Sequence, residues 1–192
     1  MCGRFSLDAS IDVIIERYKA KNTVEFLPKE EIFPTNVAPV VINNGNNEIR
    51  MMKWGFVFDF TKNPLINARA ESVDIKHSFK YSFLNKRCII PVTGFYEWEN
   101  VDGKKIKRKI FIQEDIFSLA GLYNTFRDKD GNPYEAFTII TTEANEDMKK
   151  IHQRMPVILP KDVEGLWLDT SFRDIKTLKT LLKPYNGKII IS

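Results

Sequence analysis

The chain has 192 residues, of which 43% are hydrophobic and 28% are charged, so it can bury a core and does not have the composition of a disordered protein. Its net charge of +4 permits a polyanionic partner without requiring one. Two cysteines exclude a disulfide framework, and neither a membrane-length apolar run nor a signal peptide occurs, so we expect a cytoplasmic protein with no membrane partner.

The first half of the chain predicts a helix, a hairpin and a second helix. Apolar residues recur at helical spacing over residues 11–20, after Asp8 or Ser10 as a cap. The segments "VAPVVIN" and "EIRMMKWGF" flank the tight-turn dipeptide Asn44-Gly45 and predict a hairpin. The segment "ESVDIKHSFKYSFLNK", residues 71–86, predicts a helix.

From Cys88 onward the pattern becomes that of strands. Four strands are predicted, over residues 88–98, 105–113, 116–126 and 134–142, with "VDGK" and "DKDGNP" as turns. A short helix (145–151), a strand (156–160), a helix (161–168), a helix that begins at a capping box of Ser171 and Asp174, and a strand (186–191) follow. No linker or repeat divides the chain. We therefore predict one α+β domain over residues 1–192, with a mostly antiparallel, β-barrel-like core and peripheral helices.

Several kinds of site are missing from the sequence. His77 and His152 lie far apart and near no cysteine pair, so the spacing of a zinc site is absent. No glycine-rich phosphate loop, dinucleotide fingerprint or nucleophile elbow occurs. We expect no metal and no cofactor, so an enzyme built on this chain would use its side chains and its own terminus.

The terminus begins "MCGRF", and Cys2 would become the first residue if Met1 were removed. An α-amine has a pKa near 8, so its neutral fraction at pH 7.4 exceeds that of a lysine about a hundredfold or more. The neutral amine can condense with an aldehyde, and the adjacent thiol can then close a five-membered thiazolidine ring. Alternatively, Cys2 is only a small apolar residue that starts a strand, and Cys88, inside "CIIPV", is a core residue.

Two stretches place polar side chains among apolar strands. In "INARAES", Asn67, Arg69 and Glu71 alternate with alanines, so the three share one face, which is either a solvated edge or a pocket wall. In "GFYEWEN", Glu97 stands between aromatic residues, an environment that suits proton transfer near neutrality. The alternative for Glu97 is a side chain that points into water.

Three further features are ambiguous. His152 and Arg154 precede a predicted buried strand, where the histidine serves either as an acid and base or as a structural hydrogen-bonding group. Arg4 lies two residues after Cys2 and could hold a phosphate. The run "KKIKRK" at 104–109 is either a DNA-binding patch or a solvated strand exterior, and its alternation favours the exterior.

The motifs "MCGRF", "NVAP", "WGF", "INARAE", "GFYEW" and "HQRMPVIL" occur in this order over nearly the whole chain. In combination they resemble the SOS response-associated peptidase (SRAP) family of abasic-site-processing proteins. The resemblance implies a barrel-like fold and a basic groove that binds single-stranded DNA containing abasic sites. It also implies covalent capture of these sites through the mature N-terminal cysteine, with no metal, in a protein that we expect to be monomeric.

The resemblance assigns roles to individual residues. Cys2 is the implied nucleophile, Asn67 positions the terminus and the opened sugar, Glu97 orients the amine and handles its proton, and His152 assists ring opening. A separate set is implied in DNA binding: Arg4, Arg69 and Arg154 near phosphates, Trp54 as a base-stacking or core residue, Trp98 near the groove, and His77.

This chain departs from the family pattern at two positions. His77 stands where some relatives carry an arginine that contacts DNA, which implies a weaker and pH-dependent phosphate contact. The segment "VFDFTKN" after "WGF" replaces a Pro- and Trp-rich loop, which puts stacking at a strand end in doubt.

The function expected from the resemblance is a thiazolidine crosslink to abasic sites that shields the lesion during the DNA damage response, together with weak lyase activity. Met1 is removed either by the protein itself or by an aminopeptidase. The first alternative is an amidohydrolase or peptidase whose Cys2 thiol attacks an amide with its own amine as base. The second is a nucleic-acid-binding module without covalent chemistry.

Overall fold

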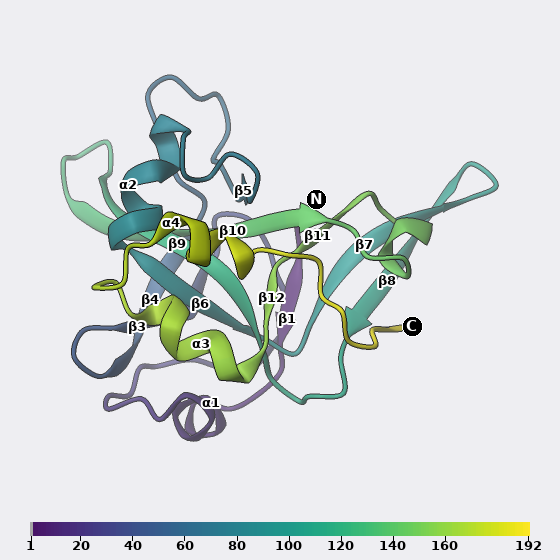
Figure 1. The fold of residues 1–192 in the computed structure, drawn as a ribbon, viewed down its shortest axis with the longest axis horizontal. Coiled ribbons are helices and arrows are strands. Elements are labelled where there is room, and N and C mark those ends of the chain that lie inside the picture. Colours follow the sequence, from purple (N-terminus) through teal and green to yellow (C-terminus); the bar gives the residue numbers. More distant parts are fainter. Residues whose placement is uncertain (1) are drawn as a thin grey trace.

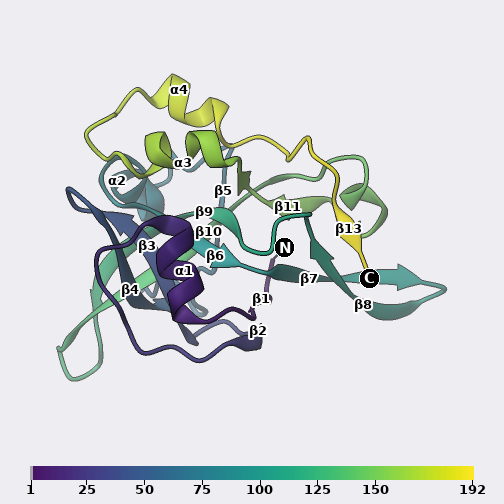
Figure 2. The same ribbon diagram turned by 90° about the horizontal axis from the view of Figure 1, so that it is seen from below.

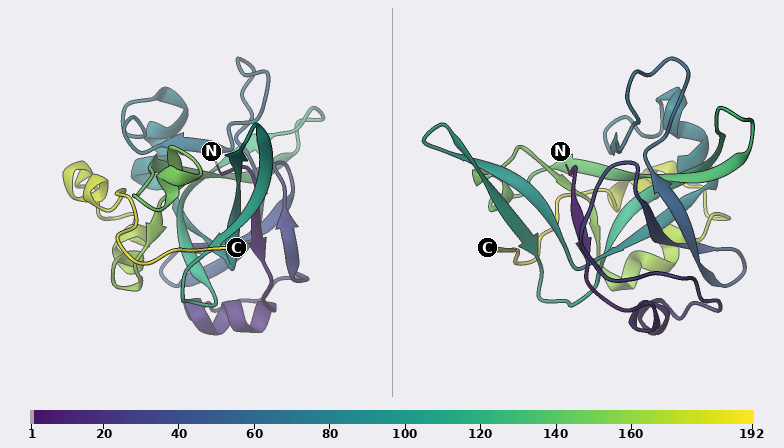
Figure 3. Two further views of the ribbon diagram at one scale, coloured as in Figure 1. Left: turned by 90° about the vertical axis from the view of Figure 1, so that its right-hand side faces the viewer. Right: turned by 180° about the vertical axis from the view of Figure 1, so that it is seen from behind.

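The computed structural model describes residues 2–192, and its larger sheet holds most of the apolar strands. The larger sheet is formed by β3 (Val37–Asn43), β4 (Asn47–Trp54), β5 (Asn67–Arg69), β6 (Arg87–Val92), β9 (Phe117–Arg127), β10 (Pro133–Glu143), β11 (Arg154–Pro156) and β12 (Ile158–Leu159). Its pairings run from β10 through β4, β3, β6 and β9 and return to β10. The strands therefore curve around a shared core, which the end-on view of Figure 3 makes visible.

The smaller sheet has the order β13-β8-β7-β1-β2. It comprises β1 (Phe5–Leu7), β2 (Lys29–Ile32), β7 (Gly94–Val101), β8 (Lys104–Phe111) and β13 (Ile190–Ile191). The β7–β8 hairpin extends away from the rest of the molecule in Figures 1 and 2. Pairing in both sheets is antiparallel except where β10 meets β4 and β5. The predicted α+β class with mostly antiparallel strands is confirmed.

The helices lie outside the sheets, as predicted (Figures 1 and 2). They are α1 (Ile11–Tyr18), α2 (His77–Asn85), α3 (Lys161–Leu168), α4 (Ile175–Thr180) and the short 3₁₀ helix η1 (Met148–Lys150). Ser10 caps α1, because its side chain accepts a hydrogen bond from the Val13 amide. Over residues 2–192, no helix has both the length and the apolar character needed to cross a membrane.

Two segments that were each predicted to form one strand contribute to two strands, which pair with different partners. The strand expected over residues 88–98 is β6 of the larger sheet and β7 of the smaller sheet, and Thr93 stands at the change, where its amide donates to the carbonyl of Ser6. The strand expected over 156–160 is β11, which pairs with β10, and β12, which pairs with β9. Hydrophobic patterning predicts that such segments are buried, but not which strand each half will pair with.

Several predicted helix limits are wrong. Residues 71–76 form turns rather than the start of α2, and Asp74 there accepts a 2.6 Å hydrogen bond from Lys179 of α4. The last helix begins after Asp174, whose carboxylate accepts from the Thr177 amide, whereas the Ser171 hydroxyl donates to Asp169. The predicted helix at 145–151 is reduced to η1, and the predicted strand at 186–191 is reduced to β13.

Hydrogen bonds from Arg87 of β6 hold two helices, α2 and α3, against the larger sheet. Its side chain is fully buried, and its guanidinium donates hydrogen bonds to carbonyl groups at the ends of α2 and α3 and in the segment that follows α3. Burial lowers the pKa of this arginine to about 10, so it remains charged at neutral pH. The accepting carbonyls are those of Phe83, Leu84, Trp167, Asp169 and Phe172.

Candidate active site

The position of Cys2 depends on how closely β1 approaches β7. Phe5 pairs with Phe95 and Ser6 with Gly94. A Cβ atom at position 94 would lie 3.1 Å from the Ser6 Oγ atom and 3.2 Å from the carbonyl oxygen of Ile110. Glycine at position 94 therefore lets β1 pack tightly between β7 and β2, and this packing fixes where the start of the chain lies.

Cys2 is completely buried at the beginning of the described chain. Its thiol lies 3.9 Å from the carbonyl oxygen of Arg4, and its own carbonyl accepts a 2.9 Å hydrogen bond from Nδ2 of Asn67. Burial and, to a smaller extent, the negative charge of Glu97 together raise the pKa of the Cys2 thiol to about 12. At neutral pH the sulfur therefore carries its proton. In Figure 1 the beginning of the described chain, before β1, lies near the arrowhead of β10.

Asn67 comes from β5, where the predicted alternation is confirmed. Ala68 and Ala70 are buried, whereas Arg69 and Glu71 are exposed on the opposite face and Asn67 is half-buried. The strand is placed by its parallel pairing with β10, in which Asn67 is the partner of Ile139. The Oδ1 atom of Asn67 is buried and accepts no hydrogen bond from residues 2–192. This face is thus half-buried beside Cys2 at Asn67 and solvated at Arg69.

Glu97 points into the protein. Its side chain is 3% exposed, so the alternative of a water-facing glutamate is wrong. Its charge acts on the Cys2 thiol, which places the carboxylate within electrostatic reach of that sulfur. Its neighbour Tyr96 is buried, and Trp98 is half-buried.

His152 is held by the backbone that follows it. Its Nδ1 atom accepts a 2.9 Å hydrogen bond from the amide of Arg154. In the neutral ring the proton therefore sits on Nε2, which is the atom able to donate. The amide of His152 donates to the carbonyl of Met148, so η1 and β11 together fix the orientation of the ring.

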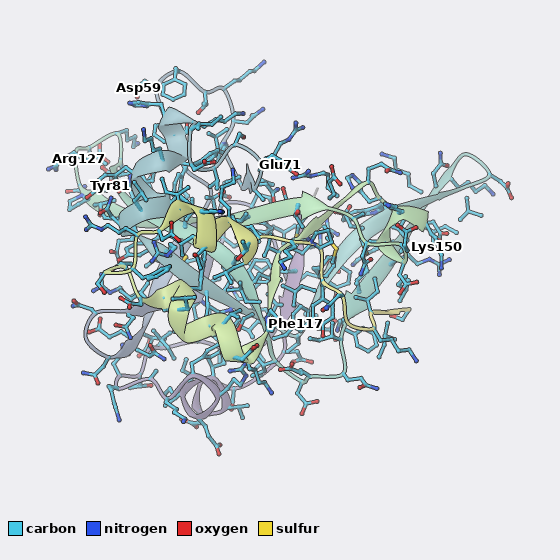
Figure 4. The ribbon with its side chains drawn as sticks, in the orientation of Figure 1. Asp59, Glu71, Tyr81, Phe117, Arg127 and Lys150 are labelled. Carbon is cyan, nitrogen blue, oxygen red and sulfur yellow. The ribbon has the colours of Figure 1, made fainter. Side chains whose placement is uncertain are left out.

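Arg154 is firmly bound within the protein. Its guanidinium donates to both carboxylate oxygens of Glu71, at 2.5 and 3.0 Å, and to the carbonyl of Thr141 at 2.8 Å. This pair lowers the pKa of Glu71. Figure 4 shows Glu71 just beyond β5, at the edge where β10 ends. Arg154 and Arg69 therefore lie on either side of β10, because β11 and β5 pair with its two edges.

The remaining predicted DNA-binding residues fall in different places. Arg4 lies on the outer side of β7 against Trp98, whereas Arg69 and His77 are exposed. Trp54 is completely buried, stacks on Phe137 and donates from Nε1 to the carbonyl of Ile66. Of the two interpretations of Trp54, the structure favours core packing over base stacking.

The structure also describes two segments whose interpretation from the sequence was open, the loop "VFDFTKN" and the basic run at 104–109. In "VFDFTKN" the rings of Phe58 and Phe60 stack at 5.0 Å, and Phe60 is 69% exposed, so this loop presents an aromatic face despite its departure from the family pattern. Residues 104–107 are exposed on β8, as expected of a strand exterior. Lys107 forms an ion pair with Glu31, and Arg108 forms one with Glu99.

Sequence reasoning missed two residues of this region. Thr141 supplies the carbonyl that holds Arg154, and Glu31 binds Arg4. Neither stands in a quoted motif, and both act through pairings between segments distant in the chain. No group of three potential metal-ligating side chains was found among the described residues.

Comparison with known proteins places this arrangement in a family. The family model described as "SOS response associated peptidase (SRAP)" matches residues 1–191. Two proteins of Bacillus subtilis, the "Abasic site processing proteins" YoqW and YoaM, are each 42% identical over 97% of this chain, covering 88% and 87% of their own lengths. A crystal structure of a Bacteroides thetaiotaomicron protein superposes with a TM-score of 0.89 at 29% identity, covering 99% of this chain and 90% of that one. The chain belongs to the SOS response associated peptidase family.

Proposed function

We propose that this protein acts on abasic sites in single-stranded DNA and captures them covalently through Cys2. The observation that carries the proposal is the setting of Cys2, a buried residue bound by Asn67 and influenced by Glu97. The names of the relatives YoqW and YoaM support abasic-site processing as the activity. The required loss of Met1 concerns a residue outside the described range.

The first step is attack by the Cys2 amine on the aldehyde of the opened sugar. The nitrogen forms a bond to C1′, the carbonyl oxygen leaves as water after protonation, and an imine results. An α-amine is a suitable nucleophile because its pKa lies near 8 and a substantial fraction is neutral at physiological pH. A lysine amine has no comparable neutral fraction.

The second step is attack by the Cys2 sulfur on the same carbon. A carbon–sulfur bond forms, the thiol proton is lost and the imine nitrogen gains a proton, so that the whole reaction releases one water molecule. The raised pKa of the buried thiol keeps it protonated at pH 7, so the second step needs a base. Glu97, buried within electrostatic reach of the thiol, is the residue suited to accept this proton.

Asn67 and His152 serve the same sequence of steps. Asn67 holds the Cys2 carbonyl through Nδ2 and offers its buried Oδ1 atom to the amine or to a sugar hydroxyl. His152, with its proton on Nε2, can protonate the ring oxygen as the sugar opens. The imine stage also allows β-elimination of the 3′ phosphate, which gives the weak lyase activity.

Arginine side chains around the end of β10 supply the affinity for DNA. Arg69 is exposed and available to a phosphate, and Arg154 and Arg4 lie near the site with carboxylate partners. Binding that depends on such contacts weakens as salt rises, because counterions are released from the DNA. His77 is exposed as well and can contact a phosphate.

Intact-mass analysis tests the proposal. The purified protein is mixed with a single-stranded oligonucleotide that contains one abasic site, heated with detergent, and weighed. The expected species has lost Met1 and has gained the oligonucleotide minus one water molecule. Retention of Met1 in active protein, or release of all DNA by heat, refutes the proposal, and amide hydrolysis in the absence of DNA supports the amidohydrolase alternative.

A further inference from the structure

Arg4 occupies a site built for a cation. Its guanidinium lies 4.4 Å from the ring centre of Phe33 and 4.9 Å from that of Trp98. Its Nε atom is buried and makes no hydrogen bond to residues 2–192. The aromatic rings fix the plane of the guanidinium and leave its terminal nitrogens directed at whatever anion lies beside it.

In this structure the anion is the carboxylate of Glu31. One oxygen of Glu31 lies 2.9 Å from Nη1 of Arg4, and the other accepts a hydrogen bond from Lys107. One carboxylate thus bridges two cations, and the hydrogen bond from Lys107 lowers the pKa of Glu31. Two oxygens spanning an arginine and a lysine reproduce the contacts that a DNA phosphate would make.

We propose that Glu31 is a specificity-determining residue that occupies the phosphate site of Arg4 and Lys107 until DNA displaces it. This inference rests on the proposed binding of single-stranded DNA. Any strand that uses Arg4 must first release Glu31, so reversible binding of DNA is weakened by the two ion pairs that are lost. Capture of an abasic site is less affected, because a covalent bond retains the strand once it has formed.

The position of Glu31 permits this exchange. Its strand, β2, is the outer strand of the smaller sheet and, among residues 2–192, pairs with β1 alone. The side chains of Arg4, Glu31 and Lys107 are 26%, 28% and 36% exposed, so water and ligand reach all three. An exposed carboxylate can rotate away at small cost, since exposed ion pairs contribute about 1 kcal/mol or less each.

Glu31→Gln tests the inference, with Glu30→Gln as the matched control. The control removes the same charge from the same strand, but the Glu30 side chain is exposed and makes no ion pair in the described chain. Binding of an undamaged, fluorescein-labelled single-stranded oligonucleotide is followed by anisotropy over a range of salt concentrations. Thermal unfolding establishes that both variants are folded.

We expect Glu31→Gln to bind undamaged DNA about three- to tenfold more tightly than Glu30→Gln at low salt. The logarithm of the association constant falls with the logarithm of the salt concentration. This slope should steepen by about 0.7 for each protein cation that becomes free to contact a DNA phosphate. The gain should shrink when Arg4→Ala is added. Equal affinity and equal slope for the two variants, or a gain that Arg4→Ala leaves unchanged, overturns the inference.

Adduct formation by the unaltered protein separates this result from the proposed function. If a heat-stable adduct forms but Glu31→Gln matches its control, the role of Glu31 is refuted and the capture chemistry stands. If the protein neither binds undamaged strands nor forms an adduct, the proposed function itself is refuted.

Discussion

The two cysteines of this chain invite comparison because their burial is the same and their surroundings differ. Cys2 and Cys88 are both completely inaccessible, both are free thiols, and burial raises the pKa of each. Cys88 lies near the start of β6, opposite Gly121 of β9, where a Cβ atom at position 121 would come within 3.1 Å of its sulfur. Cys2 lies before β1, beside the carboxamide of Asn67 and under the charge of Glu97.

The comparison teaches that burial by itself makes a thiol inert. A protonated sulfur in an apolar core, such as that of Cys88, is a packing group. What distinguishes Cys2 is its place after Met1, whose loss would free its backbone nitrogen as an amine, together with the polar neighbours Asn67 and Glu97. The two thiols therefore differ in their neighbours and not in their burial.

Removing the sulfur of Cys2 should have the largest effect on capture. Cys2→Ala should abolish the heat-stable adduct with an abasic oligonucleotide, because no thiazolidine can form. Cys88→Ala should leave the adduct yield unchanged and lower the free energy of unfolding by about 1 kcal/mol through lost packing. Denaturing gels and urea unfolding measure the two quantities. Loss of the adduct in the Cys88 variant would contradict the distinction between the two thiols.

Replacing sulfur with oxygen should have the next largest effect. Cys2→Ser keeps the amine, so an imine forms, but the oxygen closes only to a labile oxazolidine. We expect the heat-stable adduct to disappear, while treatment with borohydride traps the imine and restores a stable product. Failure of borohydride to trap any product would mean that the amine is not the attacking group.

Removing the carboxamide beside Cys2 should slow capture without abolishing it. Asn67→Ala deletes the hydrogen bond to the Cys2 carbonyl, and misplacement of a nucleophile of this kind costs about 10- to 100-fold in rate. Arg69→Ala, on the same face of β5, is the control and should reduce DNA affinity rather than the rate at saturating DNA. Single-turnover kinetics separate the two effects, and an unchanged rate for Asn67→Ala would refute its positioning role.

Alkaline pH should lower the free energy of unfolding. An unfolded cysteine ionises near pH 8.5, whereas Cys2 in the folded chain keeps its proton to about pH 12. The folded state thus binds more protons in this range, so stability is intact below pH 8.5 and falls above it by about 1.4 kcal/mol per pH unit for each such thiol. Urea unfolding between pH 8 and 10 measures the slope, which Cys88→Ala should reduce. A stability that does not change with pH would contradict the burial of both thiols.

Much of the fold could be predicted because local patterns determine it. The hairpin of β3 and β4 follows from Asn44-Gly45 between apolar runs, and α1 follows from Ser10 and the spacing of its isoleucines. The division at Thr93 and the pairing of β10 with β5 could not be predicted, because they depend on contacts between segments distant in the sequence.

In the candidate site, too, local sequence identified some features, whereas contacts between distant segments determine the others. Cys2, Asn67, Glu97 and His152 stood out through their motifs, and the alternation in β5 correctly separated inward from outward residues. The partners that hold these residues did not stand out. Glu31 and Thr141 contribute a carboxylate and a carbonyl from other strands, and nothing in their local sequence marks that contribution.

The hydrogen bonds of Arg87 affect how the protein unfolds locally. Because one guanidinium holds the ends of α2 and α3 together with the segment after α3, these parts should exchange their amide hydrogens as a single cooperative unit. Arg87→Lys would leave most of those carbonyl groups without a donor, and this helical layer would then open at a lower free energy than the strands beneath it. Arg87→Lys, which leaves Cys2 and Asn67 unaltered, would thereby shorten the lifetime of the folded protein.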